Sequence, residues 1–199
     1  MQQHAQLGFH VDMRACIGCR TCVVACKDRH DLPVGQNFRR VVEVEGGGYT
    51  ETGTGAVIPH VFAYYFSISC NHCDHPRCVA NCPTGALRKE PSDGVVCIDQ
   101  AVCIGCRYCS WSCPYGAPQY SPNTGTTRKC DLCADLRAEG QEPVCVTACP
   151  MRAIHWGPVD ELKRRFGGTM DVAGLPNPSI TSPNGRYTPH RDAGRRPKP

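Results

Sequence analysis

The apolar and polar residues of this chain alternate over short stretches only, which predicts brief strands joined by loops. Residues 9–12 (FHVD) have the two-residue period of a strand. Residues 38–44 and 57–68 are rich in β-branched and aromatic side chains, and the glycine run at 46–48 indicates a turn region between them. Residues 95–99 follow the turn at 92–94 (SDG), so we expect them to form a hairpin with the residues before that turn.

One stretch predicts a helix, and the end of the chain predicts little regular structure. Residues 159–166 (VDELKRRF) have an amphipathic pattern that ends at Gly167 and Gly168. Residues 171–199 are rich in proline, asparagine and basic side chains. We therefore expect this segment to be an extended tail that lies over a partner or in solvent.

The composition indicates that apolar packing alone gives this chain a thin core. Of the 199 residues, 41% are hydrophobic, while 20 are glycine and 17 are proline. That length fits one or two small domains, and small folds of this kind gain stability from bound metal or cross-links. The formal net charge is +4, and no basic stripe with interleaved aromatic residues predicts nucleic-acid binding.

The sequence predicts neither a membrane span nor an export signal. The best apolar run, residues 57–68, is too short to cross a bilayer and contains Pro59 and His60. Residues 1–11 have no apolar signal-peptide core and no twin arginine. We therefore expect a soluble protein without an export signal of its own.

The 17 cysteines carry the strongest signal. The spacing C-x2-C-x2-C-x3-C-P, by which bacterial-type ferredoxins hold [4Fe–4S] clusters, occurs at Cys103, Cys106, Cys109, Cys113 and Pro114. Three thiolates on a tight loop bind one cluster, and the next turn of the polypeptide delivers the fourth to a different cluster. Gly105 lets the loop backbone come close to the cluster sulfides.

The same spacing recurs three times with variations. The first group, with lysine in place of proline, is Cys16, Cys19, Cys22 and Cys26. The second group, with two extra residues in its loop, is Cys70, Cys73, Cys78 and Cys82. The fourth group, with a long insertion, is Cys130, Cys133, Cys145 and Cys149. The four groups together leave only Cys97 over.

Because the last cysteine of each group ligates a neighbouring cluster, the sequence predicts four mixed ligand sets. Set a is Cys16, Cys19, Cys22 and Cys149. Set b is Cys26, Cys130, Cys133 and Cys145. Set c is Cys70, Cys73, Cys78 and Cys113. Set d is Cys82, Cys103, Cys106 and Cys109. The cofactors we expect are four [4Fe–4S] clusters.

Two other uses of the cysteines explain the pattern less well. The odd count and the missing signal peptide disfavour a secreted disulfide scaffold. Paired zinc sites need two separated C-x2-C pairs per ion, which leaves the three-cysteine loops followed by Cys-Pro unexplained. No general base, nucleophile or open metal position is visible beyond the clusters, so we expect one-electron transfer and no catalytic residue.

The order of the groups predicts nested repetition. A hairpin stands between groups two and three, and residues 149–154 (CPMRAI) repeat the start of that hairpin, residues 82–87 (CPTGAL). We expect an α+β fold of duplicated, nested ferredoxin-like units with short strands, short helices and many loops. Residues 56–124 are then the inserted unit with groups two and three, and residues 1–55 plus 125–170 the outer unit with groups one and four.

Several residues near the cysteines have more than one interpretation. Cys97 is expected to be a small buried hydrophobic residue of the hairpin. His72 and His75 are expected beside a cluster or at the surface, because the cysteine sets are complete without them. The basic residues that flank the cysteines either raise the potential of an anionic cluster or are ordinary surface charge; they are Arg20, Lys27, Arg77, Arg107, Arg128 and Lys129.

The protein resembles the iron–sulfur subunit of anaerobic dimethyl sulfoxide reductase, within the four-cluster subunits of molybdopterin oxidoreductases. Nitrate, formate and polysulfide relatives share the cysteine groups. The strings that favour the dimethyl sulfoxide type are residues 61–65 (VFAYY), 67–73 (SISCNHC), 103–109 (CIGCRYC), 113–120 (CPYGAPQY) and 157–162 (GPVDEL).

The resemblance implies an electron-transfer subunit that is not itself catalytic. Its implied partners are a molybdopterin-containing catalytic subunit, which reduces dimethyl sulfoxide or a similar acceptor, and an integral membrane anchor that oxidises quinol. The resemblance places set a beside the catalytic subunit and set d nearest the quinol site. Nitrate reductase relatives carry tryptophan and a three-iron cluster where this sequence keeps Cys106, so four [4Fe–4S] clusters are implied here.

The resemblance also bears on location and leaves alternatives open. It implies membrane association through the partner subunits, on the periplasmic face by export together with the catalytic subunit, or else on the cytoplasmic face. The alternatives are the equivalent subunit of a polysulfide, nitrate, formate or selenate enzyme, and a free polyferredoxin carrier. The polypeptides that co-purify with this one distinguish these functions.

Overall fold

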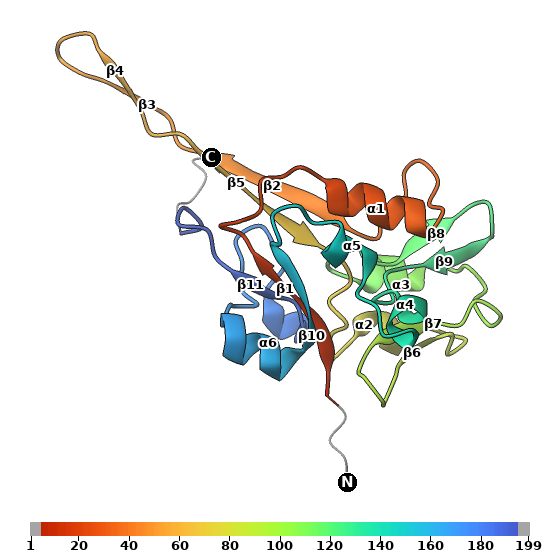
Figure 1. The fold of residues 1–199 in the computed structure, drawn as a ribbon. Coiled ribbons are helices and arrows are strands. Elements are labelled where there is room, and N and C mark those ends of the chain that lie inside the picture. The colour runs from red at the N-terminus through yellow and green to blue at the C-terminus, as the bar shows by residue number, and fades with distance from the viewer. Residues whose placement is uncertain (1–4, 195–199) are drawn as a thin grey trace.

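The computed structural model describes residues 5–194, which form a body of short elements from which one hairpin projects (Figure 1). The strands are β1 (Leu7–Asp12), β2 (Arg40–Gly46), β3 (Tyr49–Glu51), β4 (Val57–Pro59), β5 (Phe62–Ile68), β6 (Leu87–Lys89), β7 (Val96–Ile98), β8 (Gln119–Ser121), β9 (Thr126–Arg128), β10 (Ile154–Pro158) and β11 (Arg186–Thr188). The helices are α1 (Thr21–Arg29), α2 (Arg77–Ala80), α3 (Tyr108–Ser112), α4 (Ala134–Ala138), α5 (Val144–Thr147), α6 (Val159–Phe166) and the 3-10 helix η1 (Pro178–Ile180). The predicted α+β class with short elements is confirmed.

The largest sheet in the described part of the chain has three strands in the order β10-β1-β11. The predicted strand at 9–12 is confirmed as the end of β1, in the middle of this sheet. β1 pairs antiparallel with β10, where Phe9 lies opposite Trp156, and parallel with β11, where Val11 lies opposite Tyr187. Phe9, His10 and Val11 are all buried, so both faces of β1 are covered, because successive side chains of a strand point to opposite faces.

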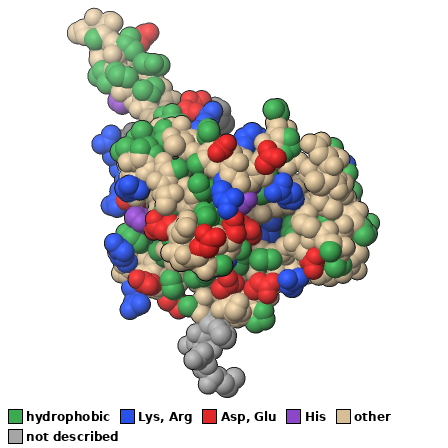
Figure 2. Space-filling model, turned by 45° about the vertical axis from the view of Figure 1, so that its right-hand side comes forward, with side chains coloured by type: hydrophobic (Ala, Val, Ile, Leu, Met, Phe, Trp, Pro, Cys, Tyr) green, Lys and Arg blue, Asp and Glu red, His purple; other side chains and the backbone are tan. Residues whose placement is uncertain are grey.

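A long two-stranded ribbon leads out of the body to the projecting hairpin. β2 pairs antiparallel with β5 from Arg40 opposite Ile68 to Gly46 opposite Phe62. Beyond this ribbon β3 and β4 form a separate hairpin, whose surface in Figure 2 carries mostly hydrophobic and uncharged side chains. The run expected as one strand at 57–68 is therefore divided into β4 and β5, with His60 and Val61 between them.

Two antiparallel strand pairs of the body have the same pattern of flanking hydrogen bonds, although only one pair joins consecutive strands. β6 and β7 form the hairpin predicted between groups two and three. In the first hairpin the N–H of Asp99 donates to the carbonyl of Ala86 at 2.8 Å, and in the second, formed by β10 and β1, the N–H of Asp12 donates to the carbonyl of Ala153 at 2.8 Å. In both, the cysteine four positions after the aspartate donates its N–H back to that aspartate's carbonyl at 3.2 Å.

The segment 171–194 differs from the extended tail that its composition predicts, because it packs back on the body. β11 joins the central sheet, and Tyr187 is 3% exposed, with its ring and that of Phe66 in an edge-to-face contact. The N–H of Asn184 donates to the carbonyl of Asn71 at 3.0 Å, which ties the segment to the second cysteine group. A few apolar residues among the prolines provide this packing. Residues 195–199 of the predicted tail lie outside the described residues.

The predicted helix at 159–166 is confirmed as α6, which buries Val159 and Leu162 and ends before Gly167 and Gly168 at φ values of 67° and 84°. No helix within residues 5–194 has the length and apolar character needed to cross a membrane. The main apolar cluster combines residues such as Phe9, Leu132 and Ile154 with six buried cysteines, which are Cys22, Cys26, Cys70, Cys130, Cys145 and Cys149. The core is thus built around the cysteine groups.

Candidate metal centres

Two cavities are each lined by four cysteines from different parts of the chain. One is lined by Cys16, Cys19, Cys22 and Cys149, which are the four members of set a. The other is lined by Cys82, Cys103, Cys106 and Cys109, which are the four members of set d. In both cavities three cysteines of one loop face the last cysteine of a different group. The thiols surround a space, and within residues 5–194 no three His, Cys, Asp or Glu side chains converge on a point that would hold a single metal ion.

Within set b, and likewise within set c, the thiols are close enough in the interior to interact electrostatically. The Cys26 thiol is influenced by its set b partners Cys130, Cys133 and Cys145. The Cys78 thiol is influenced by its set c partners Cys70, Cys73 and Cys113. Apart from the half-buried Cys113, all members of these two sets are buried.

Cysteines of consecutive sets are also neighbours. Cys22 of set a interacts electrostatically with Cys145 of set b. Cys130 of set b interacts electrostatically with Cys70 of set c. Cys78 of set c and Cys109 of set d share one apolar cluster. The four sets therefore follow one another in the order a, b, c, d through the body.

Groups one and three have the same backbone conformation, which brings three thiols onto one tight loop. Gly18 and Gly105 have φ values of 73° and 67°, and Arg20 and Arg107 follow at 62° and 65°, directly before α1 and α3. Glycine adopts such values without strain. A Cβ at Gly18 would lie 2.6 Å from the ring of Tyr65, so this loop also lies close against β5.

Groups two and four share a second conformation. Their C-x2-C turns place His72 and Leu132 at φ values of 43° and 63°. A proline then precedes each short helix, Pro76 before α2 and Pro143 before α5. Each proline is the N-cap residue of its helix, where its ring fixes φ (−74° at Pro76 and −55° at Pro143) and no N–H is left without a partner. The repetition that the cysteine spacing predicts is thus visible residue by residue.

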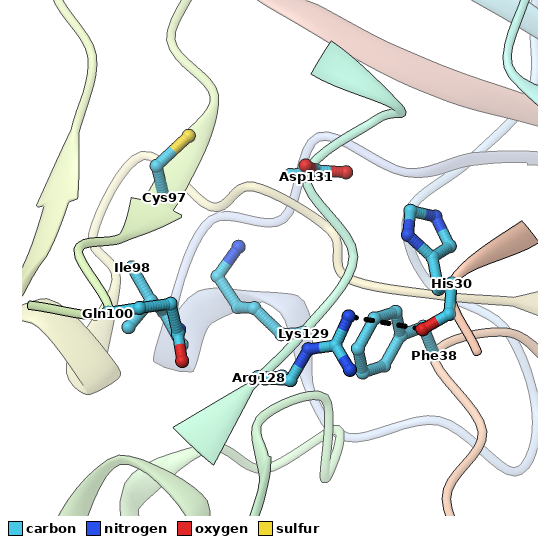
Figure 3. Close-up of a pocket in the computed structure, with 8 residues that line it drawn as sticks. All are labelled: His30, Phe38, Cys97, Ile98, Gln100, Arg128, Lys129 and Asp131. Atoms are coloured by element: carbon cyan, nitrogen blue, oxygen red, sulfur yellow. Dashed lines mark hydrogen bonds between the residues drawn. The ribbon is translucent and has the colours of Figure 1, made fainter. Parts of the chain in front are cut away.

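The residues left outside the sets have their own environments. Cys97 is half-buried in β7 and lines a separate cavity with His30, Phe38 and Lys129 (Figure 3). His72 is 1% exposed, and its Nδ1 accepts a hydrogen bond from the N–H of Val96 at 3.0 Å. Burial, with nearby cations, keeps the pKa of His72 well below its usual value, so the ring is neutral. His75 is exposed.

Burial also shifts the pKa of the cysteine thiols. It raises the pKa of Cys73 to about 11 and that of Cys78 and Cys133 to about 12. The exposed Cys19 is an exception, because hydrogen bonds from Thr21 lower its pKa. A cysteine must lose its proton to ligate metal, so loading the buried sets releases protons.

The residues present fit iron–sulfur clusters. Each set offers thiols only, which are the soft ligands that such clusters take. Backbone N–H groups already point at two of the sulfurs: Thr127 donates to Sγ of Cys103 at 3.5 Å, and Ala153 donates to Sγ of Cys149 at 3.4 Å. Such hydrogen bonds tune the potential of a bound cluster.

Sequence reasoning missed one charged residue of these centres, Arg39, which is 1% exposed and lies among the cysteines of sets a and b. Its Nη1 donates to Oγ of Ser67 and its Nη2 to Oγ of Ser69, each at 3.1 Å. Nothing in the sequence distinguishes Arg39 from Arg40, which donates to the carbonyl of Tyr115. Only the fold turns one of these neighbours inward.

Comparisons with known proteins agree with this geometry. The family described as "4Fe-4S dicluster domain" matches residues 61–159, and a second family of the same description matches residues 15–87. The protein is 51% identical to the B subunit of anaerobic dimethyl sulfoxide reductase from Escherichia coli (strain K12), over 90% of its own length and 86% of the relative. It is 47% identical to the subunit of that name from Haemophilus influenzae, over 94% and 91%. It is 40% identical to the thiosulfate reductase electron transfer subunit PhsB of Salmonella typhi, over 81% of each.

Proposed function

Since this protein belongs to the family of iron–sulfur subunits that includes the B subunit of anaerobic dimethyl sulfoxide reductase, we propose that it passes electrons from a quinol-oxidising membrane anchor to a molybdopterin catalytic subunit that reduces dimethyl sulfoxide or a similar acceptor. It is a non-catalytic electron-transfer subunit with four [4Fe–4S] clusters. The observation that carries the proposal is the unbroken succession of cysteine sets a, b, c and d through one small body.

The residues of the protein hold and insulate the relay. When bound, the clusters supply one-electron transfer. The cysteines anchor them, the left-handed positions at Gly18 and Gly105 bring loop backbone against them, and the surrounding apolar side chains exclude water. No proton has to move with the electron at any residue that we assign.

We propose the four ligand sets in full, supported by the shared cavities and by the mutual influence of the thiols. The ligands are Cys16, Cys19, Cys22 and Cys149 for cluster a; Cys26, Cys130, Cys133 and Cys145 for cluster b; Cys70, Cys73, Cys78 and Cys113 for cluster c; and Cys82, Cys103, Cys106 and Cys109 for cluster d.

The two ends of the succession are the proposed exchange points with the partners. Cys19 of set a is exposed beside Ile17, which is 56% exposed. Beside set d, Ile104 of the cysteine loop and Trp111 of α3 are 66% and 75% exposed. Apolar side chains left in solvent beside a redox centre favour a docking partner. We propose that electrons enter at set d from the anchor and leave at set a toward the catalytic subunit, because the family resemblance places these partners at those two ends.

The division into nested units is likewise a proposal. The equivalent hydrogen bonds of the β6–β7 and β10–β1 hairpins support two copies of one ferredoxin-like unit. Residues 56–124 form the inserted copy and residues 1–55 plus 125–170 the outer copy. The segment 171–194 then acts as a strap that joins them, because it adds β11 to the outer copy and bonds to the second cysteine group of the inserted one.

The relatives' names are those of subunits of reductase complexes, so this protein has catalytic partner subunits. A membrane anchor and a periplasmic position, reached by export with the catalytic subunit, are the finer parts of the proposal. Protease treatment of intact spheroplasts tests the position. Digestion of the partner-bound protein from outside is the expected result, and complete protection would move the complex to the cytoplasmic face.

The function is tested on the complex purified through a tag on this subunit. We expect a brown complex with about sixteen iron atoms and as many acid-labile sulfides per copy of the subunit, together with a molybdenum-containing subunit and a membrane subunit. Stoichiometric zinc with little iron would exclude the iron–sulfur interpretation. Recovery of this subunit alone, with its iron, would support a free carrier instead.

The ligand exchange between groups is tested by two double variants in the assembled complex. Cys82→Ser with Cys106→Ser removes two ligands of one proposed cluster, so a single electron paramagnetic resonance signal should disappear. Cys78→Ser with Cys82→Ser removes ligands that are close in sequence but belong to two clusters, so two signals should change. Loss of one signal in the second variant would mean that each cysteine group serves its own cluster.

A further inference from the structure

Two cations are buried inside the body among the cysteines. Arg39 is 1% exposed and Lys129 is 6% exposed. Within residues 5–194 no carboxylate lies within ion-pairing distance of either side chain. A buried charge without a counter-charge is strongly unfavourable, so the position of both residues needs an explanation.

Arg39 lies between sets a and b. The cysteines that interact electrostatically with it are Cys22 of set a and Cys26, Cys130 and Cys145 of set b. Its guanidinium is held in place by Ser67 and Ser69 and lies 4.3 Å from the ring centre of Phe9. Its Nε is buried and, among the described residues, has no hydrogen-bond partner. Hydroxyl groups and a ring orient this cation, but they do not neutralise it.

Lys129 lies between sets b and c. The cysteines that interact electrostatically with it are Cys130 of set b, Cys70 and Cys78 of set c, and Cys97, which belongs to no set. Its Nζ donates to the carbonyls of Val96 and Cys130. Figure 3 shows the side chains of Lys129 and its neighbour Arg128 pointing in different directions, with Arg128 directed over Phe38 toward His30. Lys129 alone of the pair points inward.

The other basic residues that flank the cysteines are placed differently. Arg20, Arg77 and Arg107 are exposed, and Lys27 and Arg128 are half-buried. Exposed charges are screened by water and salt, whereas buried charges are screened much less. Of these flanking cations only Lys129 is buried, and the fold adds Arg39 to it.

We propose that Arg39 and Lys129 are fixed internal counter-charges of the relay, one at the a–b junction and one at the b–c junction, and that each raises the reduction potential of the two clusters beside it. A cluster held by four thiolates is anionic, and each one-electron reduction adds one negative charge and no proton at these residues. A cation at a junction favours that added charge on either side. The proposal rests on the ligand sets given under the proposed function.

The test is a potentiometric titration of the purified complex with dithionite, monitored by electron paramagnetic resonance. We expect Arg39→Gln to lower the midpoint potentials of clusters a and b, and Lys129→Gln to lower those of b and c. Cluster d, which neither residue contacts, is the internal control. At a fixed potential the reduced-to-oxidised ratio of each affected cluster should fall about tenfold or more, and a tenfold change corresponds to about 59 mV for one electron.

Arg77→Gln is the matched control, because Arg77 precedes Cys78 as Lys129 precedes Cys130, but it is exposed. Its effect on the potentials should be smaller and should vanish at high salt, while the Lys129→Gln shift persists. Unchanged potentials in both buried variants, with all four signals present, would overturn the inference and leave the proposed function intact. A wild-type complex without four clusters would instead overturn the proposed function itself.

A variant that fails to assemble is also informative, through Arg39→Lys, which keeps the charge but changes the shape. If Arg39→Gln loses iron from clusters a and b while Arg39→Lys retains it, the inference is tested on Arg39→Lys, whose clusters a and b should keep potentials close to those of the wild type; potentials as low as those expected for a neutral side chain would overturn it. If both variants lose iron from all four clusters, Arg39 acts through packing and the inference fails.

Discussion

At the residue scale, the loop glycines are the most constrained positions in the centres. Gly18 has φ +73°, and a Cβ there would lie 2.6 Å from the ring of Tyr65. Gly35 has φ +89° but nothing within 4 Å of its would-be Cβ. The two positions therefore share the backbone strain and differ only in the contact.

We predict that Gly18→Ala destabilises the protein more than Gly35→Ala does. The left-handed conformation alone costs an L-residue about 1–2 kcal/mol, and forcing a methyl group into a packed site adds about 1–3 kcal/mol. Gly18→Ala should also lower the iron content at set a, which Gly35→Ala should not. Anaerobic thermal unfolding and iron analysis of both variants measure this. Equal effects would mean that the loop does not lie against β5.

His10 gives the protein a pH-dependent stability. It is 1% exposed in β1, its Nε2 is 2.9 Å from Oγ1 of Thr188, and its ring stacks on Phe166. Burial, followed by the charge of His155, lowers the pKa of His10 from 6.5 to about 4. The other charged groups that face it are Asp12 and Arg14. The folded protein thus holds this ring neutral where an unfolded chain would protonate it.

Since the folded pKa lies below the unfolded one, the stability from neutral His10 is present above pH 6.5 and is lost as the pH falls toward about 4. We predict that the unfolding midpoint of His10→Gln depends less on pH between 6.5 and 4 than that of the wild type. His60→Gln, at an exposed position of the projecting hairpin, serves as the control. Parallel curves for wild type and His10→Gln would contradict the assignment.

At the element scale, β11 shows that the C-terminal segment is part of the fold. The ring of Tyr187 is 3% exposed, and its partner strand β1 leads directly to the first cysteine group. The isolated bridge between Tyr187 and Thr169 ties the strand to the residues after α6 as well. Loss of this side chain should therefore loosen the central sheet.

We predict that Tyr187→Ala costs about 3 kcal/mol or more, as is usual for truncating a buried aromatic side chain. For a protein of this size that loss lowers the thermal midpoint by on the order of 10 °C. Tyr49→Ala, at a position 71% exposed in β3, is the control, and it should change stability by about 0.5 kcal/mol or less. A Tyr187→Ala protein as stable as Tyr49→Ala would show that β11 is not held to the body in solution.

At the scale of the whole molecule, the cysteines of the metal centres are themselves part of the hydrophobic core. The main apolar cluster contains six cysteines of the sets, and two smaller clusters are built on Cys73 and on Cys78 with Cys109. The cysteines of one set come from segments that are far apart in sequence, so each bound cluster cross-links those segments through its ligands.

We predict that anaerobic removal of the clusters unfolds most of the chain. Circular dichroism of the apo-protein should lose the strand and helix signal, and near-ultraviolet bands of the buried aromatic residues should collapse with it. Reconstitution with iron and sulfide should restore both. An apo-protein with a native-like spectrum would show that the polypeptide supports its own fold.

The sequence alone determined the cysteine groups, the α+β class, the hairpin before group three and the helix at 159–166, because each depends on local spacing or periodicity. Tertiary structure decided the rest. Arg39 turns inward while Arg40 does not, and residues 171–194 return to the body to pair β11 with β1. These two features depend on which distant segments meet in the folded protein, and neither residue spacing nor hydrophobic periodicity specifies that.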